Sequence, residues 1–266
     1  MVAAPVLEVR GLGKRFADRA GRDPSPWVIK DLSFAVDEGE FLTIIGPSGS
    51  GKTTLLNVLA QIETASTGDL RFQSQRAPVD DPKSLKPGLS CKIGYVTQED
   101  NLLPWRTTLQ NVLFPLLVQR RLDTETRARA QSLICAVGLS GFENHYPHEL
   151  SGGMRKRASL IRTLVYDPPV ILMDEPFGAL DAQTRAQLQE DLLRLWSVGR
   201  KTIVFVTHDI AEAIALGDRT LVLSRSPATV AGEYINPIPR PRDIRAIMTD
   251  PQFAALYQRI RGQLAG

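Results

Sequence analysis

The fold of this chain is decided by the stretch Gly46-Pro47-Ser48-Gly49-Ser50-Gly51-Lys52-Thr53. An apolar run at 41–45 precedes the stretch, and an apolar helical pattern at 54–59 follows it. This arrangement is typical of a phosphate-binding loop between a buried strand and a helix. The glycines let successive backbone N–H groups point at phosphate oxygens, and the positive end of the helix favours the same negative charge. The loop therefore predicts binding of a nucleoside triphosphate.

Two side chains of the loop have specific predicted roles. Lys52 would place a positive charge at the β- and γ-phosphates, and the Thr53 hydroxyl would coordinate Mg²⁺. Thr54, which opens the helix, completes the set of candidate ATP contacts. The alternative is an ordinary Gly/Ser turn, but the strand before the loop and the helix after it favour the phosphate site.

A pair of acidic residues, Asp174 and Glu175, follows the apolar run Val170–Met173. Such a pair suits Mg²⁺ coordination by the first carboxylate and activation of water by the second. By itself it would more often be a solvated strand end. Because it accompanies a phosphate loop, it predicts a hydrolytic site.

A second anion site is predicted at Leu150-Ser151-Gly152-Gly153-Met154. Ser151 lies at an N-cap position, and the two glycines expose the first N–H groups of the following helix. One chain cannot easily bring two phosphate-binding helix ends to one γ-phosphate, whereas two chains arranged head to tail can. The sequence therefore predicts a dimer with shared nucleotide sites.

The composition is that of an ordinary globular protein. The chain has 266 residues, of which 43% are hydrophobic and 23% charged, and its net charge of +3 gives no argument for a nucleic-acid partner. Cys91 and Cys135 are isolated thiols, which favours a reducing compartment. No export signal and no apolar run of membrane-spanning length is visible. We expect a cytoplasmic protein that meets a membrane only through a partner.

Apolar strands and helical patterns alternate along much of the chain. Strands are expected at 6–10, 27–36, 41–45, 70–73, 93–97, 170–173, 202–207 and 220–223, with Gly11 and Gly13 turning the chain after the first strand. Helices are expected at 52–62, from Thr107 or Thr108 to 118, from Asp123 to Gly138, after Ser151, at 182–198 and at 210–216. The tail from Asp243 is expected to be an amphipathic helix broken at Pro251. This alternation predicts an α/β fold with a mostly parallel, covered sheet, interrupted by a helical block at 99–166.

Together, these motifs resemble the ATP-binding subunit of ABC transporters over nearly the whole chain. In this comparison the phosphate loop is the Walker A motif, Leu150–Met154 is the signature motif and Val170–Pro176 is the Walker B segment. Gln98 corresponds to the Q-loop glutamine, Gly178-Ala179-Leu180-Asp181 to the D-loop, and His208 to the switch histidine. Gln98 or His208 alone would more often be an ordinary polar residue, but all the motifs follow one another in family order.

The resemblance implies a P-loop NTPase fold with a mostly parallel sheet, an N-terminal antiparallel sheet and an inserted helical subdomain. It places an ATPase domain at 6–242, the helical subdomain at about 99–166, and a helical tail at 243–266. A departure from the family pattern occurs after the phosphate-loop helix. There Gln61 and Glu63 stand where many relatives have Ala-Gly-Leu.

The resemblance also implies roles for single residues. Lys52, Glu175 and His208 would be catalytic, with Glu175 as the general base and His208 at the γ-phosphate. The Mg²⁺ ligands would be Thr53, Gln98 and Asp174. The residues that complete the partner chain's ATP site would be Ser151, Gly152, Gly153 and Asp181.

The resemblance is closest to the importer branch that takes up nitrate, sulfonates, taurine, bicarbonate or related compounds. It rests on Asn101-Leu102-Leu103-Pro104-Trp105-Arg106-Thr107, on Leu150–Arg157 with Tyr166-Asp167-Pro168, and on Pro239-Arg240-Pro241-Arg242. The implied partners are an integral membrane permease, a second ATPase subunit and, indirectly, a solute-binding protein. This would place the chain at the inner face of the cell membrane.

Two other classes of function remain open. A non-transport ABC ATPase would act as a mechanical clamp, but such proteins usually carry long coiled coils or two cassettes, which this chain lacks. A non-hydrolysing interaction module is disfavoured because Lys52, Glu175 and His208 are all present.

Two aromatic positions allow alternative interpretations. Family members stack adenine on an aromatic ring after the first strand, and Phe16 is favoured over Trp27 for this role. Trp105 lies in a loop segment and is expected to anchor a helix of the membrane subunit. The alternative is that Trp105 packs inside the helical subdomain.

Overall fold

The computed structural model describes residues 5–16, 26–72, 75–76, 93–178 and 180–265. The chain divides into two compact units. The first unit comprises Met1–Lys86 and Lys201–Gly266, and the second unit comprises Pro87–Arg200.

The first unit contains an antiparallel sheet with the strand order β2-β1-β4-β5. Its strands are β1 (Leu7–Lys14), β2 (Ile29–Val36), β4 (Thr67–Phe72) and β5 (Gln75–Arg76). Gly11 and Gly13 lie inside β1, so the expectation that they form a turn after it is wrong. A Cβ on Gly13 would lie 2.4 Å from Thr67 Oγ1, and therefore β1 can approach β4 this closely only with glycine at position 13.

A second group of strands in the first unit carries the phosphate loop. These strands are β3 (Phe41–Ile45), β8 (Thr202–Thr207), β9 (Arg219–Leu223) and β10 (Val230–Ile235), in the order β10-β9-β3-β8. β3 is parallel to β8 and to β9, and β10 is antiparallel to β9. Every residue of β3 and β8 is buried, as expected for parallel strands covered on both faces.

Strand β10 was not expected from the sequence. Its residues are exposed or half-buried, and Gly232 lies in its middle, so no continuous apolar run marks it. The strand forms because its backbone pairs with the edge of β9 from Val230 to Ile235. Long-range pairing therefore decides the structure here, and local composition does not.

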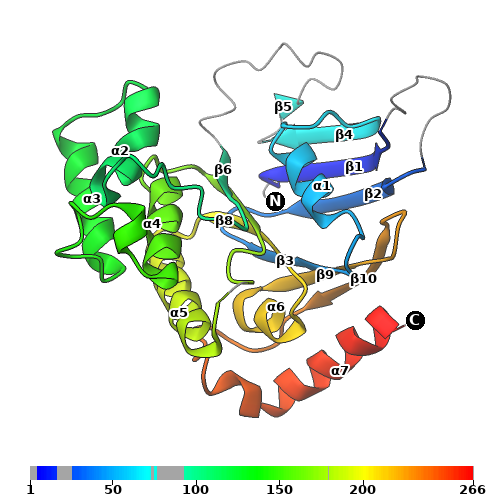
Figure 1. The fold of residues 1–266 in the computed structure, drawn as a ribbon. Coiled ribbons are helices and arrows are strands. Elements are labelled where there is room, and N and C mark those ends of the chain that lie inside the picture. Colours follow the sequence, from blue (N-terminus) through cyan, green and yellow to red (C-terminus); the bar gives the residue numbers. More distant parts are fainter. Residues whose placement is uncertain (1–4, 17–25, 73–74, 77–92, 179, 266) are drawn as a thin grey trace. The chain divides into compact units, whose positions relative to one another are not determined.

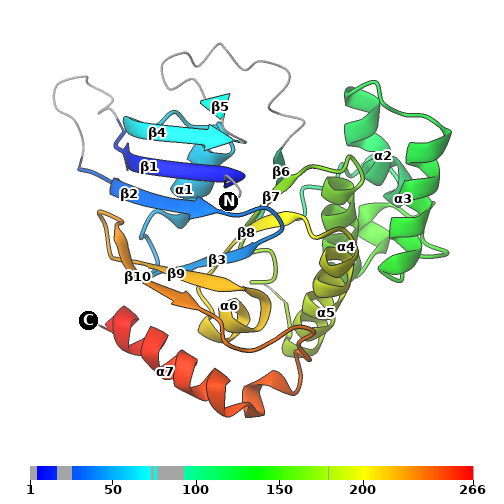
Figure 2. The same ribbon diagram turned by 180° about the vertical axis from the view of Figure 1, so that it is seen from behind.

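In the described residues of the first unit, three helices accompany these strands. Helix α1 (Lys52–Leu59) follows the phosphate loop and lies in front of the antiparallel sheet in Figure 1 and behind it in Figure 2. Helix α6 (Ile210–Leu216) follows β8, and α7 (Pro251–Ala265) packs on α6, β9 and β10. The expected break at Pro251 is wrong, because this proline begins α7. Before it there is only the short 3-10 turn η2 (Ile247–Thr249).

The second unit is mainly helical. The described part of this unit contains the strands β6 (Ile93–Val96) and β7 (Val170–Asp174), which pair in parallel. Its helices are α2 (Thr108–Val118), α3 (Thr124–Ala136), α4 (Gly152–Leu164) and α5 (Ala182–Gly199), with the 3-10 turn η1 (Pro147–Glu149) before α4. Together with the first unit, these elements confirm the expected α/β fold with parallel and antiparallel strands.

Side-chain caps fix the starts of the helices in the second unit. The Thr107 hydroxyl accepts a hydrogen bond from the Gln110 N–H in a capping box, so Thr107, not Thr108, is the N-cap of α2. Asp123 caps α3 in a second capping box, and the side chains of Ser151 and Asp181 each accept one backbone N–H at the starts of α4 and α5.

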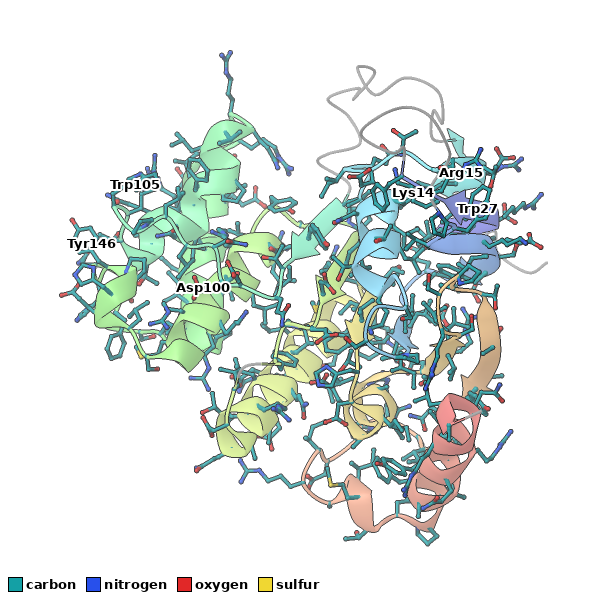
Figure 3. All side chains as sticks on the ribbon, turned by 45° about the vertical axis from the view of Figure 1, so that its right-hand side comes forward. Lys14, Arg15, Trp27, Asp100, Trp105 and Tyr146 are labelled. Carbon is teal, nitrogen blue, oxygen red and sulfur yellow. The ribbon has the colours of Figure 1, made fainter. Side chains whose placement is uncertain are left out.

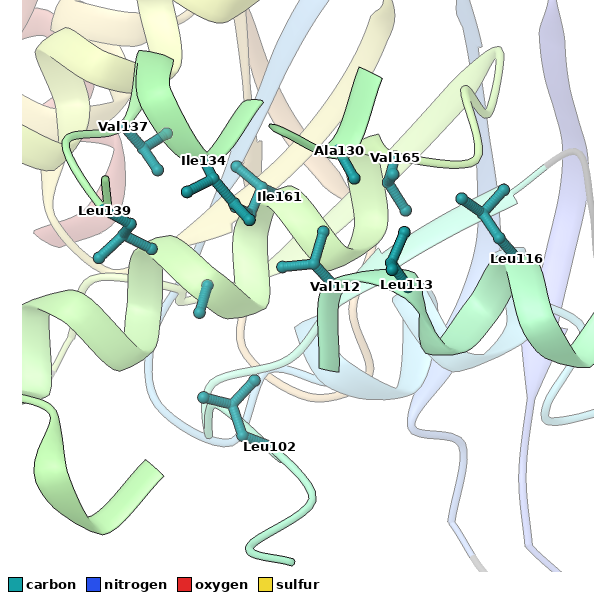
Figure 4. Packing of buried hydrophobic residues seen from close by; sticks show 11 residues of the cluster. Leu102, Val112, Leu113, Leu116, Ala130, Ile134, Val137, Leu139, Ile161 and Val165 are labelled. Atoms are coloured by element: carbon teal, nitrogen blue, oxygen red, sulfur yellow. The ribbon is translucent and has the colours of Figure 1, made fainter. Parts of the chain in front are cut away.

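One apolar cluster holds α2, α3 and α4 together (Figure 4). Its members come from all three helices and from the segments beside them: Leu102, Val112, Leu113, Leu116, Ala130, Ile134, Val137, Leu139, Ala158, Ile161 and Val165. Removing one large aliphatic side chain from such a core typically costs about 2–5 kcal/mol. The cluster therefore gives α4, which begins at the signature motif, a rigid support.

Candidate nucleotide site

The phosphate loop connects β3 to α1 in the first unit. Gly49 and Gly51 have φ values of +74° and +90°, which other residues rarely adopt. A Cβ on Gly51 would also lie 2.9 Å from Val28 Cγ1. These glycines let the backbone curl at the start of α1, which is the geometry needed to direct N–H groups at an anion.

Lys52 lies along the inside of this loop. Its ammonium group donates to the carbonyl oxygens of Gly46 at 2.9 Å and Pro47 at 3.1 Å, and only 6% of the residue is exposed. Thr53 is exposed and Thr54 is half-buried at the start of α1. The loop therefore presents an ammonium group, a hydroxyl group and backbone N–H groups, all of which suit phosphate oxygens and a bound cation.

His208 leaves the first unit's parallel strands at the same end as the phosphate loop. The register pairs Ile45 of β3 with Thr207 of β8, and Gly46 and His208 are the next residues of the two strands. Asp209 then caps α6 by accepting the N–H groups of Ala211 and Glu212. His208 is exposed at this edge of the sheet.

The two candidate adenine-stacking rings differ in their surroundings; Figure 3 labels one of them, Trp27, with Lys14 and Arg15. Phe16 is 42% exposed, and the Lys14 ammonium lies 4.8 Å from its ring centre. Trp27 is half-buried, with its Cζ3 atom 2.8 Å from the position that a Gly13 Cβ would occupy. Arg15 lies 4.9 Å from the Trp27 ring. Packing on β1 therefore accounts for Trp27, whereas Phe16 is exposed over a larger fraction of its surface.

In the second unit, the ends of β6 and β7 bring polar groups together. The register pairs Val96 with Met173, and Gln98 and Glu175 each follow two residues later. A Cβ on Gly178 would lie 3.8 Å from Glu175 Oε2 and 3.9 Å from Gln98 Nε2, so both side chains approach the same point. Glu175 has a φ of +41°, a backbone strain of the kind found at functional sites.

Asp174 ends β7 and is only 7% exposed. Burial, together with the negative charge of Asp174, raises the pKa of the Tyr95 hydroxyl, so Tyr95 stays neutral at physiological pH. Carboxylate and carboxamide oxygens are ligands that Mg²⁺ prefers. Asp174 and Gln98 therefore fit the chemistry of that ion.

The signature motif opens α4. The Ser151 hydroxyl accepts the Met154 N–H at 3.3 Å, and Ser151 and Gly152 are exposed. A Cβ on Gly153 would lie 2.7 Å from Thr184 Cγ2 of α5. Thr184 also donates its N–H to the N-cap residue Asp181 at 2.9 Å, so the starts of α4 and α5 are in contact.

Sequence reasoning missed the residues that hold the segment after Gln98. This segment is contacted by three cationic side chains of α4, namely Arg155, Lys156 and Arg162. The only sign of them in the sequence is the cationic run Arg155-Lys156-Arg157. Such a run is more often a solvated helix face.

Comparisons with known proteins identify the family to which this chain is similar. Residues 29–178 match the family model described as ABC transporter. The taurine import ATP-binding protein TauB of Yersinia pestis is 39% identical over 263 residues, which cover 97% of each chain. An uncharacterized ABC transporter ATP-binding protein of Methanocaldococcus jannaschii is 42% identical over 241 residues, which cover 91% of this chain and 86% of the relative.

Further similarity is found to an importer subunit and to a solved structure. The aliphatic sulfonates import ATP-binding protein SsuB of Bacillus cereus is 38% identical over 236 residues, covering 89% of this chain and 88% of the relative. A dimeric ATP-binding cassette bound to ADP and Pi superposes with a TM-score of 0.73 at 32% identity, covering 86% of this chain and 98% of that one. This chain belongs to the ABC transporter family, as an ATP-binding cassette.

Proposed function

We propose that this chain is the ATP-hydrolysing subunit of an importer, which couples hydrolysis to solute uptake through a separate membrane subunit. The observation that carries the proposal is the approach of Gln98 and Glu175 to one point beside Gly178. A carboxylate and a carboxamide placed together can orient and deprotonate an attacking water. An interaction module without hydrolysis would not need this pair.

The residues of each unit have distinct roles in this proposal. In the first unit, the phosphate loop and Lys52 hold the phosphates, Thr53 supplies a hydroxyl to Mg²⁺, and His208 contacts the γ-phosphate. In the second unit, Asp174 and Gln98 are Mg²⁺ ligands, and Glu175 takes the proton of water. A Mg²⁺ ion held by these residues would neutralise charge that develops on the phosphates.

A second copy of this chain completes each site. Ser151, Gly152 and Gly153 form the N-terminal end of α4 with its backbone N–H groups, and Asp181 caps α5, whose Thr184 side chain faces Gly153. These groups would bind the γ-phosphate of ATP held by the partner chain. The dimeric form of the similar solved cassette supports this arrangement.

The solute and the other partners follow from the relatives. TauB and SsuB are named for import of taurine and of aliphatic sulfonates. We infer that this chain serves a solute of that kind or the related nitrate or bicarbonate, together with a permease and a solute-binding protein. In the described part of the chain, no helix is long and apolar enough to cross a membrane. The permease would hold the chain at the cytoplasmic face.

The loop at 103–107 is the proposed contact with the permease. Trp105 is 71% exposed, so the alternative that it packs in the core is wrong (Figure 3). The fully buried Asn111 side chain accepts the Leu103 N–H at 2.7 Å and donates to the carbonyls of Arg106 and Thr107 at 2.9 and 3.0 Å. The loop is thereby fixed, and it presents an exposed aromatic anchor without a large ordering cost.

The proposal is tested by the variant Glu175→Gln. It should bind ATP with unchanged affinity, run as a dimer with ATP in gel filtration and lose nearly all turnover. Residual turnover above about a tenth of the normal rate, a loss under about 1.4 kcal/mol, would show that Glu175 is not the general base. Glu125→Gln changes the same charge on the exposed start of α3 and should hydrolyse ATP normally.

Copurification distinguishes the importer from the mechanical clamp. The tagged chain, expressed with its chromosomal neighbours, should copurify with an integral membrane protein, and ATP hydrolysis in that complex should support uptake of taurine or an alkyl sulfonate into vesicles. Copurification with a DNA-repair or ribosomal complex would favour the clamp.

A further inference from the structure

The segment from Gln98 to Asn101 is fastened to α4 at several points within the second unit. The Lys156 ammonium donates to the carbonyl of Gln98. Arg162 donates to the carbonyls of Asp100 at 2.8 Å and Asn101 at 2.6 Å. These contacts leave the segment little freedom to move independently of α4.

The cationic side chains that hold this segment are themselves partly buried. Burial lowers the pKa of the Lys156 ammonium, and the negative charges of Asp100 and Glu99 partly offset this effect. Burial likewise lowers the pKa of Arg162, again opposed by Asp100. Both cations have given up part of their hydration, which is tolerable because backbone carbonyls replace the water.

Arg155 is the one member of the group that also reaches the signature motif. Its Nε atom lies 3.1 Å from Asp100 Oδ2, and its Nη1 atom donates to the carbonyl of Leu150 at 2.8 Å. Leu150 directly precedes the N-cap residue Ser151. A single planar guanidinium group therefore joins the segment after Gln98 to the residue before the signature helix.

We propose that Arg155 is a positioning residue that couples the two ATP sites to which one chain contributes. This inference rests on the proposed function, in which Gln98 serves the chain's own ATP and Ser151, Gly152 and Gly153 serve the partner's ATP. A shift of Gln98 at one site is transmitted through Asp100 and the Arg155 guanidinium to Leu150, and so to the helix end at the other site. The coupling acts equally in the reverse direction, because linkage between binding sites is reciprocal.

The contribution of the Arg155–Asp100 ion pair to folding stability is too small to account for this arrangement. The side chains of Arg155 and Asp100 are 36% and 29% exposed, and ion pairs with this exposure contribute little to folding. The rigid guanidinium fork can hold a carboxylate and a carbonyl at once, whereas the compact lysine ammonium is less suited to do so. Arg155→Lys should therefore keep the fold and the charge but lose the double contact.

The experiment measures steady-state ATP hydrolysis by the full-length dimer against ATP concentration. The normal protein should give a Hill coefficient above one. In Arg155→Lys the coefficient should fall to about one and the turnover number by about fivefold or more, the lower end of typical coupling factors. ATP affinity of the monomer, measured without Mg²⁺, and the unfolding midpoint should not change.

Two further variants make the test specific. Arg157→Lys carries the same substitution on the same helix, but Arg157 pairs with Asp191 at 3.2 Å instead of with the segment after Gln98, so it should keep the normal Hill coefficient. The double variant Asp100→Arg with Arg155→Asp restores an ion pair, but its carboxylate at position 155 cannot donate to Leu150. It should remain uncoupled.

Three outcomes would overturn the inference: a Hill coefficient of one in the normal protein, normal cooperativity in Arg155→Lys, or cooperativity restored by the charge swap. None of these results would affect the proposed function, which depends on turnover and its loss in Glu175→Gln. Conversely, full turnover in Glu175→Gln would show that Glu175 is not the general base. The Hill coefficients would still test the coupling through Arg155.

Discussion

The ammonium group of Lys14 lies 4.8 Å from the centre of the Phe16 ring. It also donates to Glu63 Oε2 and to the carbonyl of Thr64, each at 2.8 Å, and Lys14 is only 7% exposed. Glu63, which departs from the family pattern, is thus the ionic partner of a buried cation. A cation held beside an aromatic ring attracts it, so Lys14 fixes Phe16 relative to the end of the phosphate-loop helix.

The first prediction concerns adenine. If Phe16 stacks the base, Phe16→Ala should weaken ATP binding about five- to over a hundredfold, because base–aromatic stacking contributes about 1–3 kcal/mol. The dissociation constant is measured by titration without Mg²⁺, so that turnover does not interfere.

Trp27→Ala is the matched comparison. Its ring packs over Gly13 of β1, so the variant should lower the unfolding midpoint while leaving ATP affinity within about twofold of normal, a difference under about 0.5 kcal/mol. The opposite pattern, with normal affinity in Phe16→Ala and weak affinity in Trp27→Ala, would assign the stacking role to Trp27.

The second prediction concerns transport coupling at Trp105. Because this side chain is 71% exposed, Trp105→Ala should change the unfolding free energy of the isolated chain by no more than about 0.5 kcal/mol, and ATP affinity should be normal. Solute uptake by the complex should be lost, since the anchor at the permease contact is gone. Val118→Ala removes another exposed apolar side chain, at the end of α2, and should transport normally. Equal loss of uptake in both variants would argue against a specific anchor.

Much of the fold was predictable because the strands and caps carry local signals. The runs at 41–45, 170–174 and 202–207 are mainly apolar because both faces of these strands are buried. Asp123 and Ser151 mark helix starts because their side chains replace the missing intrahelical acceptors. The phosphate loop and the signature motif also carry a local signal, because each combines glycines with the start of a helix.

The features of the fold and of the site that the sequence did not predict depend on contacts between residues far apart in the sequence. Nothing local shows that Gly13 faces Thr67, and therefore two glycines in β1 were mistaken for a turn. Arg155 was equally hidden, because a cationic helix residue has no preferred partner until Asp100 is brought against it. Pro251 was ambiguous because proline can either interrupt a helix or begin one.

The third prediction is a pH dependence at the start of α5. Backbone and side-chain hydrogen bonds from Thr184 lower the pKa of the Asp181 carboxyl below its usual 3.8. The capping contribution is therefore complete above pH 3.8 and is lost as the pH falls through the lower, folded-state pKa. Amide exchange in the first turn of α5, corrected for intrinsic rates, should become faster in that range.

Asp181→Asn should remove this dependence, because asparagine caps a helix without titrating. Asp123, which caps α3 and whose pKa is lowered in the same way by Thr126, provides an internal reference. The amides in the first turn of α3 should still lose their protection from exchange in acid when Asp181→Asn is present. A dependence at α5 that survives the substitution would assign the titration to another group.

The last prediction separates packing from phosphate binding at the signature motif. A Cβ on Gly153 would lie 2.7 Å from Thr184 Cγ2, whose backbone is held by Asp181, so Gly153→Ala should cost about 1–3 kcal/mol of stability through overpacking. Adding Thr184→Ser removes the clashing methyl group and should restore the unfolding midpoint.

The matched control is Gly152→Ala. Its Cβ meets nothing closer than Arg155 Nη2 at 3.9 Å, and the variant should fold normally. If the N-terminal end of α4 binds the partner's ATP, hydrolysis should be low in Gly152→Ala. It should also stay low in the double variant Gly153→Ala with Thr184→Ser, although its stability is restored. In each case the added Cβ blocks close approach of the phosphate. Full hydrolysis in the double variant would mean that Gly153 is needed only to let α4 pack on α5.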